Sequence, residues 1–323
     1  MTEQNHKHTD GQRFYNPTLK NSTDQKSFWQ GLRMWYSTPK AKWPKHVSNI
    51  AVPQIQNNVA EKHIAVTFVN HVTFLLQLPG LNILTDPVWC KRASPFSYLG
   101  PMRVRDPGVS LDQLPPIDLV LISHNHYDHL DTKTIQYLNN KFNPQFCIAM
   151  GDNRITRKLG IKNCQEMDWW QSLSINAQTQ ITFTPMQHWS GRGLFDQYKS
   201  LWGSYVIEHN GSKIFFGGDG GYCTHFHDIH TKFGDFDLAF IGIGSYEPRW
   251  FMKNMHTNPE EAVLIHKDLH AKQSIGMHFG TFQLSAEGID QPVIDLQRAK
   301  DKHSIVETSF ITLNEGETRI FKI

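Results

Sequence analysis

The residues best suited to chemistry gather in one short stretch, residues 123–131, which reads SHNHYDHLD. In an extended chain the side chains of His124 and His126 point to the same side, so both imidazoles can reach one metal ion. Asp128 and His129 follow where the chain turns and can reach a second point close by. Imidazole and carboxylate groups are common ligands of zinc and iron. The stretch therefore predicts a metal site. The alternative, a polar loop with chance histidines, is disfavoured by three histidines within six positions.

A buried strand and a helix are expected on either side of this stretch. Residues 117–122 are mostly apolar and follow two prolines, which predicts a strand in the middle of a sheet. Asp131 can cap a helix in which Ile135 and Leu138 are three positions apart. The predicted metal-binding stretch would then lie at the carboxyl end of a strand, where open sheets place their ligand sites.

The second half of the chain repeats this arrangement, because three further apolar strands each end at a potential ligand. These ligands are His188 after residues 181–186, Asp219 after residues 214–216 and His278 after residues 274–277. A lone histidine after a strand is most often an ordinary core or surface residue, and Asp219 between glycines could be only a turn. Strands with helices between them, and ligands at their ends, predict a layered, sheet-based fold around one metal centre.

The composition limits the class of protein and its partners. At 323 residues the chain could be one large domain or two small ones. Its 32 Lys and Arg nearly balance 30 Asp and Glu, and there is no basic stripe, so nucleic acid is not an expected partner. The cysteines show no CxxC pairing and fit reduced thiols (Cys90, Cys147, Cys164 and Cys223). Without the apolar core of a signal peptide or a run of about 18 apolar residues, we expect a cytoplasmic protein.

The first 60 residues are expected to form an extension to a hydrolase domain that covers residues 61–323. Residues 1–24 are polar and are expected to be loosely ordered. An amphipathic helix follows, with the apolar face Phe28, Trp29, Leu32, Trp35 and Tyr36 and the basic neighbours Lys26, Arg33, Lys40, Lys42 and Lys45. This pattern is typical of a helix that lies on an anionic membrane surface, and the alternative is a helix packed onto the domain by its aromatic side.

A strand meander and a long loop are predicted between this extension and the metal-binding stretch. Residues 63–86 show the alternation and turn residues of three short strands. His71 lies between two of them and could support the metal site from behind or be an ordinary loop histidine. Residues 88–114 are rich in proline and aromatic residues and have no clear period, which predicts an ordered loop of the kind that lines sites.

The stretch 124–129 resembles the HxHxDH signature of the metallo-β-lactamase superfamily. The resemblance implies an α/β (α+β) fold, the four-layer αβ/βα sandwich of that superfamily. It also implies two metal ions that share one carboxylate. The ligands would be His124, His126 and His188 for one ion, Asp128, His129 and His278 for the other, and Asp219 for both. Zinc is the default metal, and iron or manganese is compatible with the same ligands.

Many short stretches also resemble the N-acyl-phosphatidylethanolamine phospholipase D family. In chain order they are residues 84–87, 92–95, 114–118, 122–131, 168–170, 187–189, 201–204, 246–252, 259–262 and 280–282. The resemblance implies hydrolysis of the phosphodiester on the head-group side of N-acyl-phosphatidylethanolamine, to phosphatidic acid and an N-acylethanolamide. It further implies a phospholipid substrate and peripheral contact with a membrane, here its inner face, and it leaves a homodimer open.

Within this resemblance, Asp128, Asp219 and His256 are the expected catalytic residues. His256 matches a family histidine near the site and could be a proton donor or a substrate contact. The alternative is a surface histidine that precedes a helix. Tyr127 could contact the phosphate or pack beneath the metals.

The chain departs from the family's pattern at two positions. Asn70 stands where glycine is usual before His71. Gly220 stands where a small hydroxyl residue usually follows the bridging aspartate, so one hydrogen bond behind the metals is not expected.

Two alternative functions stay open. The nearest is a lactonase or phosphodiesterase of the same fold that acts on a soluble substrate. An apolar groove beside the metals would favour a lipid, whereas a small basic pocket would favour a sugar phosphate. The other alternative, a non-catalytic membrane-binding protein with a relict site, is disfavoured by the complete set of seven ligands.

Overall fold

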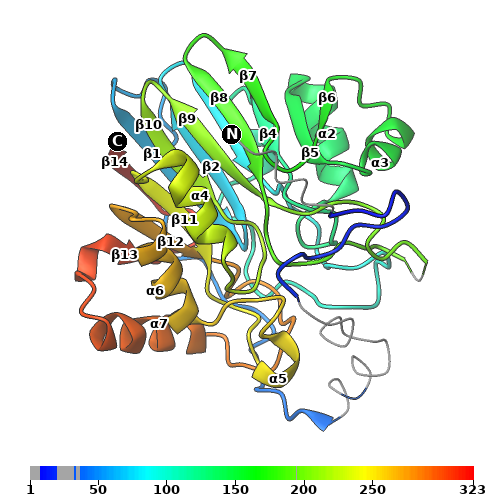
Figure 1. Ribbon diagram of the computed structural model, residues 1–323, viewed down its shortest axis with the longest axis vertical. Helices are drawn as coiled ribbons and strands as arrows, with labels where there is room; N and C mark the ends of the chain where they lie inside the picture. Colours follow the sequence, from blue (N-terminus) through cyan, green and yellow to red (C-terminus); the bar gives the residue numbers. More distant parts are fainter. Residues whose placement is uncertain (1–7, 20–32, 34–36, 194) are drawn as a thin grey trace.

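The computed structural model describes residues 8–19, 33, 37–193 and 195–323 (Figure 1). The aromatic face predicted near the N-terminus lies outside these residues, because its members are Phe28, Trp29, Leu32, Trp35 and Tyr36. Two stacked β-sheets with helices on their outer faces make up the body of the described chain (Figure 1).

The first sheet has seven strands in the order β14-β1-β2-β3-β4-β5-β6. They are β1 (His63–Asn70), β2 (Thr73–Leu78), β3 (Leu81–Thr85), β4 (Leu119–Leu121), β5 (Gln145–Ala149), β6 (Cys164–Met167) and β14 (Thr318–Lys322). Strands β1, β2 and β3 form the predicted antiparallel meander. From β3 to β6 the strands are parallel, so their carboxyl ends meet at one edge of the sheet.

The second sheet also has seven strands, in the order β13-β12-β11-β10-β9-β8-β7. They are β7 (Ser172–Asn176), β8 (Thr179–Thr184), β9 (Ser204–His209), β10 (Ser212–Phe216), β11 (Leu238–Gly242), β12 (Gln273–Met277) and β13 (Phe310–Ile311). A tight turn at Asn210-Gly211 joins β9 to β10 as a hairpin. Strands β10 to β13 are parallel, and their carboxyl ends again share one edge.

Helices cover the outer face of each sheet (Figure 1). The first sheet carries α2 (Thr132–Phe142) and α3 (Asn153–Lys158), and the second carries α4 (His225–Phe233), α6 (Pro259–Asp268) and α7 (Gln291–Lys302). Short helical turns are α5 (Arg249–Met252), η2 (Leu111–Gln113) and η3 (Glu307–Ser309). None of the helices in the described part of the chain combines the length and apolar character that a bilayer span requires.

Alternate residues of one strand show why the layers stack in this way. Phe74 and Leu76 of β2 face the second sheet, whereas Leu75 packs on the other side with Ile135 of α2. The rings of Phe74 and Phe240 (β11) are 4.6 Å apart between their centres and join the two sheets. Because both faces of the strand are buried, it reads as nearly continuously apolar. The predicted αβ/βα sandwich is confirmed.

The helix start predicted at Asp131 is also confirmed, and a second helix shows the same kind of cap. Asp131 accepts a hydrogen bond from the Lys133 amide at the start of α2. Asn258 and Glu261 form a reciprocal capping box at the start of α6, and Pro259 takes the first helical position.

The expectation that residues 1–24 are loosely ordered is wrong for the described residues 8–19. The Phe14 amide donates to the Tyr198 carbonyl at 2.8 Å, and Asn16 is buried. Further along, the Trp43 indole donates to the Glu287 carbonyl at 2.9 Å. Polar composition predicted disorder, but these segments find their hydrogen-bond partners on the surface of the sandwich. The boundary at residue 60 stays a prediction.

Candidate metal centre

All seven predicted ligands meet where strands of both sheets end. The first four follow β4, and the others follow β8, β10 and β12 (His124, His126, Asp128 and His129; His188; Asp219; His278). Six of them are buried and His126 is half-buried. The structure therefore brings together all seven residues that the sequence analysis named, and their role as metal ligands stays a prediction.

Three histidine nitrogens form the first group. His124 Nε2 lies 2.8 Å from His126 Nδ1, and His188 Nε2 lies 3.3 Å from the same atom. Metal–nitrogen bonds of about 2.0–2.1 Å in a tetrahedral site place the nitrogens about 3.3 Å apart. The spacing of these three atoms suits one cation.

The second group surrounds the carboxylate of Asp128. Its Oδ2 lies 3.3 Å from His278 Nε2, 3.6 Å from His129 Nε2 and 3.1 Å from His71 Nε2. His71, for which the sequence left two interpretations open, is therefore part of the site and not an ordinary loop residue. It is almost fully buried.

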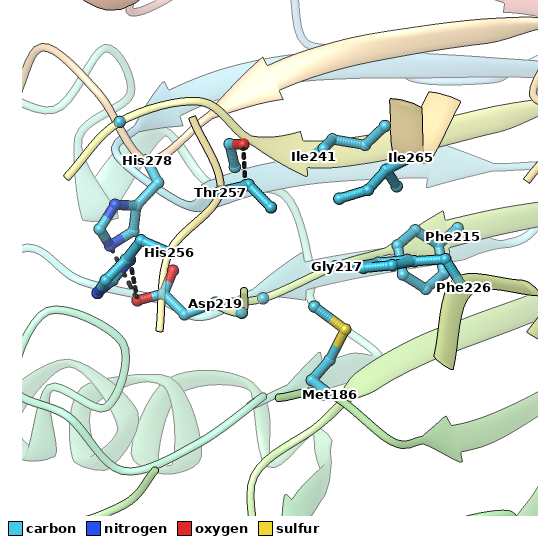
Figure 2. Close-up of a pocket in the computed structure, with 14 residues that line it drawn as sticks. Met186, Phe215, Gly217, Asp219, Phe226, Ile241, His256, Thr257, Ile265 and His278 are labelled. Atoms are coloured by element: carbon cyan, nitrogen blue, oxygen red, sulfur yellow. Dashed lines mark hydrogen bonds and ion pairs between the residues drawn. The ribbon is translucent and has the colours of Figure 1, made fainter. Parts of the chain in front are cut away.

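Asp219 lies between the two groups, as a shared ligand would. Its Oδ2 is 3.1 Å from both His129 Nε2 and His278 Nε2, and 3.7 Å from His188 Nε2. Figure 2 shows the side chains of His256 and His278 converging on this carboxylate.

The donor set fits metal ions better than a network of hydrogen bonds. The buried Nε2 atoms of His129 and His278 each lie 3.1 Å from Asp219 Oδ2, but neither makes a hydrogen bond of ordinary geometry among the described residues. A buried polar atom without such a bond costs free energy, so two such atoms beside one carboxylate need an explanation. Cations bound by imidazole and carboxylate would provide it.

A carboxylate behind the site orients two of the histidines. Asp86 accepts hydrogen bonds from the Ser123 amide, from Ser123 Oγ and from His129 Nδ1, at 2.7, 2.6 and 2.7 Å. Ser123 Oγ in turn lies 3.0 Å from His124 Nδ1 and can accept its proton. Both imidazoles then carry hydrogen on Nδ1 and leave Nε2 free for a metal. The sequence did not assign Asp86 to the site; its only signal was the family-like stretch 84–87.

Three other supports come from distant parts of the chain. His188 Nδ1 donates to the Met255 carbonyl at 2.8 Å. The side chain of Asn16 donates to the His188 carbonyl at 2.8 Å and accepts from the His188 amide at 3.1 Å. Between the first two histidines, Asn125 donates to Asp152 at 2.7 Å and accepts from the Gly191 amide at 2.8 Å. None of these contacts has a sequence signature.

Burial and charge divide the imidazoles into two kinds. Burial lowers the pKa of His126 to about 3 and that of His188 to about 4, so both are neutral at pH 7. Burial also acts against a charge on His278, but Asp219 and Asp128 outweigh it and raise its pKa to about 9. In the metal-free chain, the positive charge of the His278 imidazolium therefore balances the carboxylates of Asp128 and Asp219. A bound cation would replace this positive charge.

The site opens into a cleft of about 570 Å³. Its apolar wall includes Phe96, Trp189, Met252 and Leu284. Tyr127 also lines it; its hydroxyl donates to the Arg192 carbonyl at 2.8 Å, and the Arg192 guanidinium lies 3.9 Å from the centre of its ring. The structure thus places Tyr127 in the cleft, as expected of a substrate contact, and its role stays a prediction.

His256 lies deeper in the cleft, with Nδ1 3.7 Å from Asp219 Oδ2. Its ring centre is 5.1 Å from that of His188 and 5.2 Å from that of His278. It is therefore part of the site and not a surface histidine. Burial lowers the pKa of His256 well below its usual value, so the imidazole is neutral at pH 7.

The departure at Gly220 has a steric reason. A Cβ at this position would lie 2.4 Å from Met186 Cε. Figure 2 shows Met186 beside Asp219, on the side of a small void also lined by Thr257. The end of the Met186 side chain fills the space next to Gly220, so a hydroxyl side chain there would require this flexible end to move.

Comparison with known proteins gives the same assignment as the geometry. The family described as "Beta-lactamase superfamily domain" matches residues 81–279. An N-acyl-phosphatidylethanolamine-hydrolyzing phospholipase D 1 of Caenorhabditis elegans is 38% identical over 80% of this chain and 76% of its own length. A mitochondrial protein of that name from Saccharomyces cerevisiae is 39% identical over 66% of this chain and 47% of its own length.

A solved structure shares the fold. The isothiocyanate hydrolase from Delia radicum gut bacteria superposes with a TM-score of 0.64 at 18% identity, over 80% of this chain and 99% of that one. The fold, the extent of the family match and the two relatives agree. This chain is therefore a metal-dependent hydrolase that belongs to the N-acyl-phosphatidylethanolamine-hydrolysing phospholipase D family within the β-lactamase superfamily.

Proposed function

We propose that this chain hydrolyses N-acyl-phosphatidylethanolamine at the phosphodiester on the head-group side and releases phosphatidic acid and an N-acylethanolamide. The observation that carries the proposal is the cleft, in which an apolar wall with Phe96, Met252 and Leu284 faces Asp128 and Asp219. Such a wall suits acyl chains, and the floor is where a phosphate would meet cations. The names of the two curated relatives support the same substrate.

We infer that two divalent cations serve this reaction, with zinc as the first choice and iron or manganese compatible. The residues that would hold them are His124, His126 and His188 for one, Asp128, His129 and His278 for the other, and Asp219 for both. When bound, such a pair lowers the pKa of a water molecule and stabilises the charge of the transition state.

The protein's own residues bind and orient the substrate. The Arg192 guanidinium is fixed by hydrogen bonds to the Asn125 and Leu130 carbonyls at 2.9 and 2.7 Å, and it lines the cleft. This cation would attract the phosphate and hold it above the centre. Tyr127, under the guanidinium, keeps that side chain in place.

His256 would contact the oxygen of the leaving group. Because burial keeps its imidazole neutral at pH 7, we expect it to donate a hydrogen bond from the neutral ring, which is a weaker acid than imidazolium. Its Nδ1 faces Asp219 at 3.7 Å, which leaves Nε2 for the substrate.

Hydrolysis in ¹⁸O-labelled water tests which bond breaks. The metal-replete protein is given N-acyl-phosphatidylethanolamine in mixed micelles, and both products are analysed by mass spectrometry. We expect the label in phosphatidic acid, because the water attacks phosphorus. Label in the N-acylethanolamide would refute the proposed bond cleavage.

We further propose that the rim of the cleft contacts a membrane surface. Phe96 lines the cleft and is 50% exposed, and Tyr98 and Leu99 in the same loop are 77% and 61% exposed. Phe195 and Trp250, which are 82% and 49% exposed, are each two positions from a residue that lines the cleft, Gly193 and Met252. Single exposed apolar side chains are ordinary, but several of them in segments that line one cleft favour an interaction surface. Tyr98→Ser with Leu99→Ser should weaken binding to anionic vesicles and spare hydrolysis of a short soluble diester. Val306→Ser, at a residue 67% exposed elsewhere, is the control.

A soluble substrate is the second candidate, because a basic pocket of about 500 Å³ lies next to the cleft. Its lining includes Lys91, Arg92, Lys133 and Arg192. Such a pocket would bind a sugar phosphate or a small diester better than it would bind acyl chains. Turnover of small diesters or lactones, without turnover of N-acyl phospholipids, would favour this candidate.

A further inference from the structure

A second cluster of metal-binding side chains lies on the outer helical layer. His230 is in the last turn of α4, Asp235 follows that helix, and His270 follows α6. His230 Nε2 lies 3.0 Å from Asp235 Oδ1, and His270 Nδ1 lies 3.4 Å from the same oxygen. All three donor atoms lie within 4.8 Å of one another.

This cluster is separate from the candidate metal centre. Asp235 comes before β11 and His270 before β12, at the amino ends of two parallel strands. Gly242 and His278, by contrast, lie at the carboxyl ends of the same strands. Each strand has five residues, so the two sites are about 16 Å apart along the sheet.

We propose that His230, Asp235 and His270 form a surface site for one divalent transition cation, with zinc as the first choice. The two spacings to Asp235 Oδ1 are close to the distance of about 3.3 Å between ligands of a tetrahedral zinc ion. The two imidazole rings are stacked, with centres 4.1 Å apart, so one exposed ring has to turn for both nitrogens to point at the ion. Two imidazoles and one carboxylate leave a position for water, and a cation can enter because the side chains of Asp235 and His270 are 66% and 61% exposed.

The surroundings favour a cation at this place. The cluster lies at the carboxyl ends of α4 and α6, where the helix dipoles carry partial negative charge. The nearby ammonium groups already have partners: Lys213 donates to the Phe233 carbonyl, and Lys272 lies 2.7 Å from Asp237. A bound ion would link the ends of two helices that pack against each other on the second sheet.

A metal titration of the full chain tests the site. Zinc is added against a chromogenic competing chelator at pH 7.5, and the number of bound equivalents is compared between wild type and variants. His230→Ala, His270→Ala and Asp235→Asn should each weaken one equivalent by at least about tenfold, while the others and turnover persist. His227→Ala, at an exposed histidine of α4 outside the cluster, should leave every equivalent unchanged.

A second readout does not depend on the stoichiometry of the central site. Zinc added beyond the central equivalents should shift the ring resonances of His230 and His270 in NMR spectra and raise the melting temperature. Equal zinc binding by wild type and the His230→Ala, His270→Ala double variant would overturn the proposal. Ring resonances that do not shift at 100 µM free zinc would also overturn the proposal. The three side chains would then form only a hydrogen-bonded triad.

Discussion

Asp86→Asn is the sharpest test of how the fold prepares the metal centre. In the native chain the Asp86 carboxylate accepts three hydrogen bonds, two from Ser123 and one from His129 Nδ1. Through the Ser123 hydroxyl it also fixes His124, whose Nδ1 lies 3.0 Å from that oxygen. One carboxylate therefore sets the tautomer of a ligand in each of the two groups.

Asparagine has nearly the same shape but turns one acceptor into a donor. If the amide NH₂ faces His129, the ring must accept at Nδ1 and carry its proton on Nε2, where a metal would bind. If it faces the Ser123 amide instead, two donors meet in a buried place. Either conflict costs about 1–3 kcal/mol of unfolding free energy. Loss of such an orienting partner also lowers metal affinity by about 10- to 100-fold.

The assay is competition for zinc against a chelator of known affinity, with thermal unfolding of the metal-free chain measured in parallel. Ser123→Ala provides a milder variant, which should weaken the histidine group through His124 and leave the bond from His129 to Asp86 in place. Asp118→Asn is the control, because Asp118 is exposed and precedes β4, at the opposite end of that strand from the metal centre. Its carboxylate accepts a hydrogen bond from the Asn82 amide at 2.8 Å. Zinc affinity of a folded Asp86→Asn chain within twofold of wild type would refute the reasoning.

Three further perturbations separate the functions of single residues. Asp219→Asn should reduce turnover by orders of magnitude and lower the melting temperature of the metal-free chain, because Asp219 stabilises the His278 imidazolium. Activity within tenfold of wild type would place the reaction elsewhere. Asn16→Ala removes two hydrogen bonds to His188 and should lower the unfolding free energy by about 1–3 kcal/mol, measured by chemical denaturation. It should also lower zinc affinity, measured by competition with a chelator, and unchanged affinity would contradict the positioning role. Burial raises the pKa of Asp152 from 3.8 to about 7, so its contribution to stability is present below pH 3.8 and is lost as the pH rises through 7. Asp152→Asn should therefore flatten the dependence of the unfolding free energy on pH between pH 4 and 8. An unchanged slope would argue against the shift.

The sequence could bring the candidate ligands together because a local rule locates them. His188, Asp219 and His278 come within four residues of the ends of the buried strands β8, β10 and β12. These three strands run in the same direction, so their carboxyl ends lie at one edge. The consecutive apolar residues Phe74, Leu75 and Leu76 likewise indicate a strand that is buried on both faces, as the sandwich requires. These features depend only on neighbours in the chain.

The supports of the ligands could not be predicted, because they depend on contacts between distant segments. Asp86 is 43 positions from His129, and Asn16 is 172 positions from His188. An aspartate after a strand and an asparagine in a polar segment are ordinary in any sequence. The strand β14 was missed for the same reason, since nothing in residues 318–322 indicates pairing with β1.

The size of the cleft connects the proposed substrate to the proposed membrane contact. A volume of about 570 Å³ lies within the range of about 300–1,000 Å³ that holds a drug-sized ligand. A phospholipid with three acyl chains is far larger, so most of each chain has to stay outside. Phe96 lines the cleft, its ring centre lies 5.9 Å from that of the exposed Tyr98, and Leu99 is exposed as well. Under the proposal, the acyl chains would pass over these side chains into a bilayer. A soluble substrate would need no such surface. If the exposed side chains of this rim can be replaced without loss of lipid turnover on vesicles, the case for a membrane-bound lipid substrate weakens with them.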